Sequence, residues 1–216
     1  MPRVAINLVT WNSEKSIGAT LESLAGQTCT DTSVTVIDNA STDGTLDILH
    51  DWEARGVKVI CNPVNEGFAR AHNTAIRHTD SEYVLLVNPD IILSETFVDE
   101  MVCAASSELE IGSVSGRLLQ IDPDGLQAAL AEQGRLLDSA GLAMSRSRRQ
   151  RLRGFQQDTA SHYSHSAHIF GPDGAAPLYR RAMLEDVQIE GEIFHETFHT
   201  HKEDVDLAWR AQLLGW

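Results

Sequence analysis

The stretch Tyr83-Val84-Leu85-Leu86-Val87-Asn88-Pro89-Asp90 decides the fold of this chain. Its apolar run, which contains two β-branched valines, predicts a strand that is buried on both faces. Because proline cannot donate to a central ladder, the strand ends at Asn88. Asp90 then stands just past the carboxyl end of a core strand, and open α/β sheets bind their ligands at that edge.

Two interpretations of Asp90 follow from this stretch alone. A carboxylate at such an edge suits a hard divalent cation that holds a diphosphate. It suits equally well an Asn-Pro-Asp turn with a solvated aspartate. The rest of the chain has to decide between them.

The first half of the chain alternates short apolar runs with segments of helical periodicity. Such alternation with short connections predicts right-handed βαβ units, and therefore an α/β fold with a mainly parallel, twisted sheet flanked by helices. The expected strands are Val4–Val9, Val34–Ile37, Val57–Cys61 and Tyr83–Val87, and the expected helices include Ala69–His78 and Glu203–Leu214.

After about Gly112 this rhythm stops, and a smaller region of mixed strands is expected. Short segments at 113–120, 127–130 and 142–145, with a turn at 122–125, are typical of hairpins. The arginine-rich stretch that continues to about Ser166 is interpreted as a mobile loop.

Composition and motifs exclude several classes of protein. The formal charge of −14 argues against a protein that coats nucleic acid. The longest apolar runs are about as long as a strand, so no membrane span is expected. Three scattered cysteines without metal-ligand spacing are typical of a reducing cytoplasm. The turn Thr10-Trp11-Asn12-Ser13 lacks the glycine pattern of a dinucleotide fold, and no Gly-Lys-Ser/Thr phosphate loop is present.

Polar clusters follow the ends of all four expected strands. Because the carboxyl ends of parallel strands lie at one edge of a sheet, we expect these clusters to converge on one ligand. The clusters are Thr10–Asn12, Asp38–Gly44, Asn65–Asn73 and Asn88–Asp90.

Together with two later motifs, these clusters resemble those of family 2 glycosyltransferases with the GT-A fold, near the bacterial rhamnosyltransferase-like branch. The later motifs are Gly174-Ala175-Ala176 with Leu178-Tyr179-Arg180-Arg181, and Glu203-Asp204-Val205-Asp206-Leu207-Ala208-Trp209-Arg210. The resemblance implies one domain over residues 1–216, with a nucleotide-sugar-binding half at 1–111 and an acceptor-side half at 112–216. Relatives usually continue past this last helix, and a C-terminal extension is not expected here.

The resemblance places the donor site in the first half. Asp38 would accept a hydrogen bond from the imide N–H of uracil or thymine, and Thr10 would line the base and ribose pocket. Arg70 would sit close to the base and diphosphate, and Gly67 would supply backbone geometry. Taken without the resemblance, Asp38 also suits a capped turn and Arg70 an exposed helix position. The expected donor-binding residues are Thr10, Trp11, Asn12, Asp38, Asn39, Gly67, Arg70, Asn73 and Asn88.

Asn88-Pro89-Asp90 takes the place of the family's Asp-x-Asp motif. The resemblance implies that Asp90 coordinates Mg²⁺ or Mn²⁺ bridging the two phosphates of the donor. Asparagine at the first position is a weaker, neutral ligand, so we expect a looser metal site.

The Glu203-Asp204 motif would supply the acceptor side. Asp204 matches the family's catalytic base, and Glu203 would orient it or bind the acceptor. Acids in a first helical turn also simply favour the helix dipole, which is the structural alternative. Asp206 is expected to pair with Arg210 at i, i+4. The expected acceptor-binding residues are Gly174, Ala175 and His201.

The sequence therefore predicts a metal-assisted, inverting hexosyl- or rhamnosyltransferase of surface-glycan synthesis. It would use a UDP- or dTDP-linked sugar donor and a saccharide or lipid-linked saccharide acceptor, and it would not bind nucleic acid. A cytoplasmic location is expected, with attachment to the inner membrane surface left open. The alternatives are a sugar nucleotidyltransferase and a non-catalytic nucleotide-sugar-binding protein.

The basic run Arg146–Arg153 keeps several interpretations. It could contact the diphosphate, a lipid-diphosphate acceptor or an anionic membrane surface. A solvated loop is the structural alternative.

Overall fold

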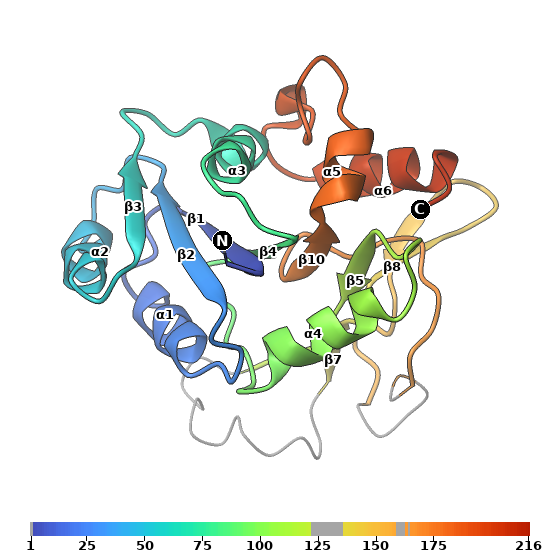
Figure 1. Cartoon of the computed structure of the whole chain (residues 1–216), viewed down its shortest axis with the longest axis horizontal. Helices are drawn as coiled ribbons and strands as arrows, with labels where there is room; N and C mark the ends of the chain where they lie inside the picture. The colour runs from blue at the N-terminus through green and yellow to red at the C-terminus, as the bar shows by residue number, and fades with distance from the viewer. Residues whose placement is uncertain (1, 122–135, 159–162, 164) are drawn as a thin grey trace.

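The computed structural model describes residues 2–121, 136–158, 163 and 165–216. Its centre is a six-stranded sheet with the strand order β3-β2-β1-β4-β10-β5 (Figure 1). The first four strands in this order are parallel, and β10 is antiparallel to both of its neighbours. The strands are β1 (Val4–Thr10), β2 (Thr32–Asp38), β3 (Lys58–Cys61), β4 (Tyr83–Val87), β5 (Ser113–Ser115) and β10 (Pro177–Arg180).

Helices cover both faces of this sheet (Figure 1). One face packs against α1, α2 and α4, and the other against α3, α5 and α6. This arrangement confirms the α/β fold predicted from the alternation of strands and helices. The helices are α1 (Ile17–Ala25), α2 (Thr45–Glu53), α3 (Gly67–Arg77), α4 (Phe97–Ser106), α5 (Arg181–Asp186) and α6 (Glu203–Leu213).

Strand β4 is buried along its whole length, as its sequence predicts. Leu85 and Val87 point into the core on the α1 and α4 side. Val84 and Leu86 point into the core on the α3 and α6 side. The strand therefore joins both cores, and it fixes the position of Asn88–Asp90 immediately beyond its end.

Within the arginine-rich stretch, the expectation of a mobile loop was wrong for the hairpin at 142–152, and residues 159–162 and 164 lie outside the described residues. Residues Leu142–Met144 (β8) and Gln150–Leu152 (β9) form an antiparallel hairpin. Leu142 is fully buried and pairs with Leu152, so apolar residues anchor a hairpin whose arginines lie outside. A second small pair joins β6 (Leu118–Leu119) to β7 (Leu137–Ser139). The segments expected at 122–125 and 127–130 lie outside the described residues.

The strand and helix boundaries differ from the expectations by a few residues. β1 runs on to Thr10 and β2 to Asp38, because the parallel ladder continues past the last apolar side chains. α3 begins at Gly67, two residues earlier than expected. Over the described residues, no helix has the length and apolar character needed to cross a bilayer.

Truncation of Leu85 tests the central place of β4. Because this side chain is fully buried between sheet and helices, Leu85→Ala should lower the free energy of unfolding by about 2–5 kcal/mol. Leu109→Ala is the matched control, since Leu109 is 80% exposed and its truncation should change stability by less than about 0.5 kcal/mol. Urea denaturation measures both. Equal effects of the two substitutions would contradict this account of the core.

Candidate active site

The predicted convergence of strand ends is present at the carboxyl edge of the sheet. Thr10 at the end of β1 lies opposite Asp38 at the end of β2. The Asn39 N–H donates to the Thr10 carbonyl at 2.8 Å, and the Asn62 N–H donates to the Asp38 carbonyl at 2.8 Å. These backbone contacts hold the ends of three neighbouring parallel strands together.

Asp38 has one satisfied carboxylate oxygen and one that lacks a partner. Its Oδ2 accepts the Ser41 N–H at 3.0 Å, which is the turn-capping contact considered from sequence. Its Oδ1 is buried without a hydrogen bond, as is Oγ1 of Thr10. A buried polar atom without a partner costs about 1–3 kcal/mol. A ligand with a suitably placed N–H or hydroxyl would remove that cost.

A pocket of about 710 Å³ lies at the same edge. Three expected site residues line it, namely Asn12, Asn88 and Asp90. Two further lining residues, Lys15 and Phe68, were missed as site residues. Lys15 follows a strand-end cluster, which is the signal that would have found it.

The pocket suits a ligand-borne cation better than a cation held by protein alone. Among the described residues, no three His, Cys, Asp or Glu side chains form a metal-binding group. Asp90 is an exposed carboxylate on the pocket wall, which Asn88 and the carboxylates of Glu14 and Asp43 also line. Mg²⁺ is usually bound by one or two carboxylates plus substrate phosphates, so this donor set fits a metal that arrives with a diphosphate.

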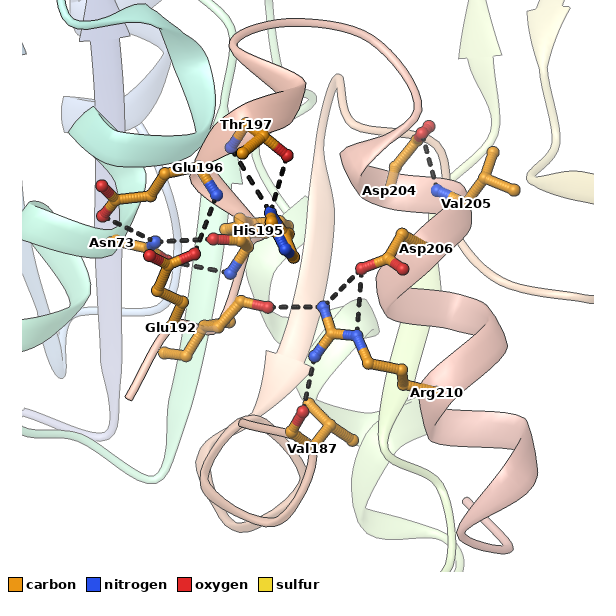
Figure 2. A network of polar contacts seen from close by, with 12 residues as sticks. Asn73, Val187, Glu192, His195, Glu196, Thr197, Asp204, Val205, Asp206 and Arg210 are labelled. Carbon is orange, nitrogen blue, oxygen red and sulfur yellow. Dashed lines mark hydrogen bonds and ion pairs between the residues drawn. The ribbon is translucent and has the colours of Figure 1, made fainter. Parts of the chain in front are cut away.

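Other expected donor residues make contacts within the protein. The Asn39 amide donates to the Gly67 carbonyl at 3.2 Å. The Asn73 amide is 1% exposed; it donates to the Phe194 carbonyl at 2.7 Å and accepts the Phe194 N–H at 2.9 Å (Figure 2). The Arg70 Nε lies 2.6 Å from Glu196 Oε2. Trp11 remains 55% exposed.

Gly67 has the backbone role that was expected. Its φ is +82°, and a Cβ there would collide with the ring and carbonyl of His199. The His199 carbonyl accepts the Phe68 N–H at 2.7 Å, so it satisfies a free donor at the start of α3. A side chain at position 67 would push the segment before α6 away from α3.

The acids of α6 lie next to the loop that precedes β10. A Cβ on Gly174 would lie 3.7 Å from Glu203 Oε1 and 3.9 Å from Asp204 Cβ. In the same loop, the Ala175 carbonyl accepts the Asn88 N–H at 2.9 Å. Gly174 and Ala175 therefore connect the Glu203-Asp204 motif to the Asn88–Asp90 turn.

Asp173 is a member of this site that the sequence analysis did not find. It is 7% exposed, and its carboxylate accepts the Ser139 hydroxyl and, at 3.0 Å, the Ala175 N–H. It fixes the turn that carries Gly174. Its position directly before the Gly174-Ala175-Ala176 motif was the available signal.

Burial raises the pKa of both helix-opening acids. For Glu203, desolvation is the largest cause, and the neighbouring charge of Asp204 raises its pKa further. For Asp204, desolvation again dominates, the Val205 N–H lowers the pKa, and the charge of Asp173 raises it. The Oε2 atom of Glu203 is buried without a hydrogen bond. A raised pKa makes a carboxylate a better proton acceptor.

Asp206 belongs to a separate contact, as expected. Its Oδ2 accepts hydrogen bonds from Arg210 Nε at 3.0 Å and Nη2 at 2.8 Å. The same guanidinium donates to the carbonyls of Val187 and Ile193. Figure 2 shows Asp204 at the top of α6, pointing away from this pair. The i, i+4 prediction is confirmed, and Arg210, which Asp206 holds in place, ties α6 to the segment before it.

His201 is exposed and stands in a strained turn before α6. Its φ is +68°, and that of the following Lys202 is +76°. The charge of His201 acts on Glu203 and lowers the pKa of that acid, although less than burial raises it. His201 is therefore at the edge of the acid site, where an acceptor-binding role remains a prediction.

Residues 6–187 match the family described as Glycosyl transferase family 2. The chain belongs to glycosyl transferase family 2. Among curated members, it is 31% identical over 126 residues to a chondroitin synthase from Escherichia coli, covering 58% of this chain and 18% of the relative. It is 24% identical over 131 residues to a putative glycosyltransferase, EpsE, from Bacillus subtilis, covering 59% of this chain and 47% of the relative. The chain thus spans less than half of either relative.

Solved glycosyltransferase structures share the fold. A mannosyltransferase from Pyrobaculum calidifontis, in complex with GDP-Man and Mn²⁺, matches with a TM-score of 0.68 and 21% identity. That match covers 100% of this chain and 53% of the other. Staphylococcus aureus TarS residues 1–349 with UDP match with a TM-score of 0.67 and 22% identity, covering 98% of this chain and 55% of the other. The GT-A fold expected from sequence is confirmed, whereas the rhamnosyltransferase-like branch stays a prediction.

The raised pKa values of Glu203 and Asp204 predict that replacing either acid by its neutral amide stabilises the fold, by an amount that depends on pH. A carboxyl group whose pKa is higher folded than unfolded favours folding below its unfolded pKa, and this contribution is lost as pH rises through the folded pKa. In Glu203→Gln and Asp204→Asn the side chain stays neutral at every pH, so the variants do not lose stability as the pH rises through the folded pKa. The Tm difference, variant minus wild type, should therefore be larger at about pH 7 than at about pH 4.

Differential scanning fluorimetry across this pH range measures the difference. Asp51→Asn is the control, because Asp51 is exposed on α2. As a surface substitution, it should change stability by less than about 0.5 kcal/mol. A flat pH dependence for Glu203→Gln and Asp204→Asn would refute the raised pKa values.

Proposed function

We propose that this chain is an inverting glycosyltransferase domain. It transfers a sugar from a UDP- or dTDP-linked donor to a saccharide or lipid-linked saccharide acceptor in surface-glycan synthesis. Family membership supports the reaction class. The names of relatives support the pathway class, since they include a poly(ribitol-phosphate) β-glucosyltransferase and a poly-β-1,6-N-acetyl-D-glucosamine synthase.

One observation carries the proposal: two separated acidic sites adjoin one hollow. Asp90 lines the pocket directly. Asp204 lies beside Gly174, and Gly174 is also near Phe68, which lines that pocket too. A direct displacement needs a charge clamp at the leaving group and a base at the acceptor, and this arrangement supplies both.

Donor recognition is assigned to the strand ends. The free oxygen of Asp38 accepts the imide N–H of the base, and the hydroxyl of Thr10 lies opposite it. Both atoms are buried and have no hydrogen-bond partner among the described residues, which supports this role. Asn39 and Asn73 act indirectly, because their amides hold α3 and the segment before α6 in place.

Transfer follows from the placement of the acids. Asp204 takes the proton of the acceptor hydroxyl as that oxygen attacks the anomeric carbon, while the bond from this carbon to the diphosphate breaks. Attack from the face opposite the leaving group inverts the anomeric centre. Glu203, with one unpaired oxygen beside Asp204, orients the acceptor. Mg²⁺ or Mn²⁺ held by Asp90 and the diphosphate would neutralise the charge of the leaving group.

Donor nucleotide binding should be visible as thermal stabilisation. At a ligand concentration 100 times the Kd, UDP or dTDP with Mn²⁺ should stabilise the fold by about 2.7 kcal/mol, which raises the Tm by about 5–10 °C. Asp38→Ala should lose most of this shift, because it removes the acceptor for the base. CDP is the comparison ligand, since cytosine lacks the N3–H that uracil and thymine would donate to Asp38. No shift with any nucleotide would contradict the donor site.

Asp204→Asn separates transfer from binding. The amide keeps the shape of the side chain but cannot take a proton, so transfer should fall by at least about 100-fold. The thermal shift with UDP and Mn²⁺ should remain. Asp51→Asn is the control and should keep wild-type turnover. Donor binding without transfer or donor hydrolysis in the wild type would favour the non-catalytic alternative.

A further inference from the structure

The β8–β9 hairpin carries a basic surface in an acidic protein. Five of the chain's 17 Lys and Arg residues lie within the eight positions 146–153, while the formal net charge is −14. Arg146, Arg148, Arg149 and Arg151 are exposed. In the part of the chain that the structure describes, the guanidinium groups of Arg146, Arg149 and Arg151 have no ion pair or hydrogen bond.

The turn that presents these arginines is held by its own hydrogen bonds. The Ser145 N–H donates to the Arg149 carbonyl at 3.0 Å, and the Arg148 N–H donates to the Ser145 carbonyl at 2.9 Å. The Ser145 hydroxyl also accepts the Arg149 N–H at 3.0 Å. The positive charges are therefore displayed on an ordered turn, which lowers the entropy cost of binding an anion.

The hairpin is attached to the elements that carry the acids. At its base, the Leu142 N–H donates to the Gly171 carbonyl at 2.7 Å, two residues before Asp173. Along β9, Gln150 Oε1 accepts from Lys202 Nζ at 2.5 Å, directly before Glu203. Figure 1 shows the hairpin beside α6. Its basic surface therefore adjoins the acceptor side of the site.

Arg148 adds a third attachment. Its guanidinium lies 5.8 Å from the ring centre of Trp209 on α6, within the range of a cation–π contact. It thus packs against α6, whereas Arg146, Arg149 and Arg151 remain available to a ligand.

We propose that Arg146, Arg149 and Arg151 bind an acceptor glycan that carries repeated negative groups, phosphate or carboxylate. This rests on the proposed function, because it names the class of acceptor that the same site would use. Guanidinium groups pair readily with both kinds of anion. The contacts with Gly171 and Lys202 hold the hairpin next to the segments that carry Asp173 and Asp204. A glycan chain bound to the hairpin would therefore extend toward Asp204.

A glycan chain fits this surface better than a membrane. Surfaces that dock on bilayers combine basic residues with large exposed apolar side chains. None of the large exposed hydrophobic residues of the described chain lies within the hairpin, residues 142–152. A bilayer would also face the acidic remainder of the molecule, whereas a thin chain contacts the hairpin alone. A thin chain on the hairpin would feel little repulsion from the acidic residues elsewhere on the protein, because charges more than about 8 Å apart are screened at physiological salt.

The test compares two triple variants with the same change in net charge. The hairpin variant is Arg146→Gln/Arg149→Gln/Arg151→Gln. The control is Arg55→Gln/Lys58→Gln/Arg77→Gln, which removes exposed cations from elements away from the hairpin. The probe is fluorescently labelled oligogalacturonate, an anionic glycan, followed by anisotropy without metal. A neutral dextran oligomer is the uncharged comparison.

The wild type should bind oligogalacturonate and not dextran. Three cation–anion contacts predict a loss of affinity of roughly 20-fold between 50 and 200 mM salt. The hairpin variant should bind at least about tenfold more weakly, with a salt slope lower by about two, and the control should resemble the wild type. Equal losses in both variants, or no loss in either, would overturn the proposal. So would arginine-dependent binding to phosphatidylglycerol vesicles without binding of the glycan.

The thermal shift with UDP and Mn²⁺, measured on the same preparations, separates this proposal from the proposed function. The hairpin variant should keep both its unliganded Tm and its nucleotide shift while it loses the glycan. If no nucleotide shift occurs in any variant but the arginines still bind oligogalacturonate, the donor site fails and the anion-binding hairpin stands.

Discussion

The burial of β4 on both faces is the constraint on which the rest of the structure depends. Leu85 and Val87 belong to one core, and Val84 and Leu86 to the other. A strand fixed in this way cannot slide without exposing apolar side chains on one side. The turn at Asn88–Asp90 therefore has a fixed position relative to the ends of β1 and β2. The hydrophobic burial of β4 therefore holds the side chains at this edge of the sheet in fixed positions.

Backbone contacts join the two halves of the chain next to the site. The Ala175 carbonyl accepts the Asn88 N–H, and the His199 carbonyl accepts the Phe68 N–H. Such contacts tolerate many side chains but little change in backbone path. Small residues at 67 and 174 fit this role, because a Cβ at Gly67 would collide with His199. The motifs recognised in the sequence thus include residues that fix the backbone of the site.

Much of the fold was predictable because its determinants are local. The apolar run of β4 and the strand–helix alternation each depend on neighbouring residues, and both were found. The Asp206–Arg210 pair was predictable for the same reason. The contacts of Asn73 with Phe194 and of Arg70 with Glu196 join residues more than 100 positions apart, and no local pattern announces them. The first strand of the β8–β9 hairpin was expected at 142–145, but β9 was interpreted as part of a loop, because the only apolar residue that it pairs with Leu142 is Leu152.

The antiparallel direction of β10 has a topological consequence. In a purely parallel sheet, only loops that follow strands reach the ligand-binding edge. Since β10 runs opposite to β4, the loop before it, residues 171–176, arrives at that edge instead. The spacing between the pocket and the α6 acids is thereby set by one short connection, which is joined to the end of β4 through the Ala175 carbonyl and the Asn88 N–H. In the glycosyltransferase that we propose, insertions or deletions in this connection would alter which acceptors fit while the ends of β1 and β2 keep their geometry, so donor and acceptor preference would diverge separately.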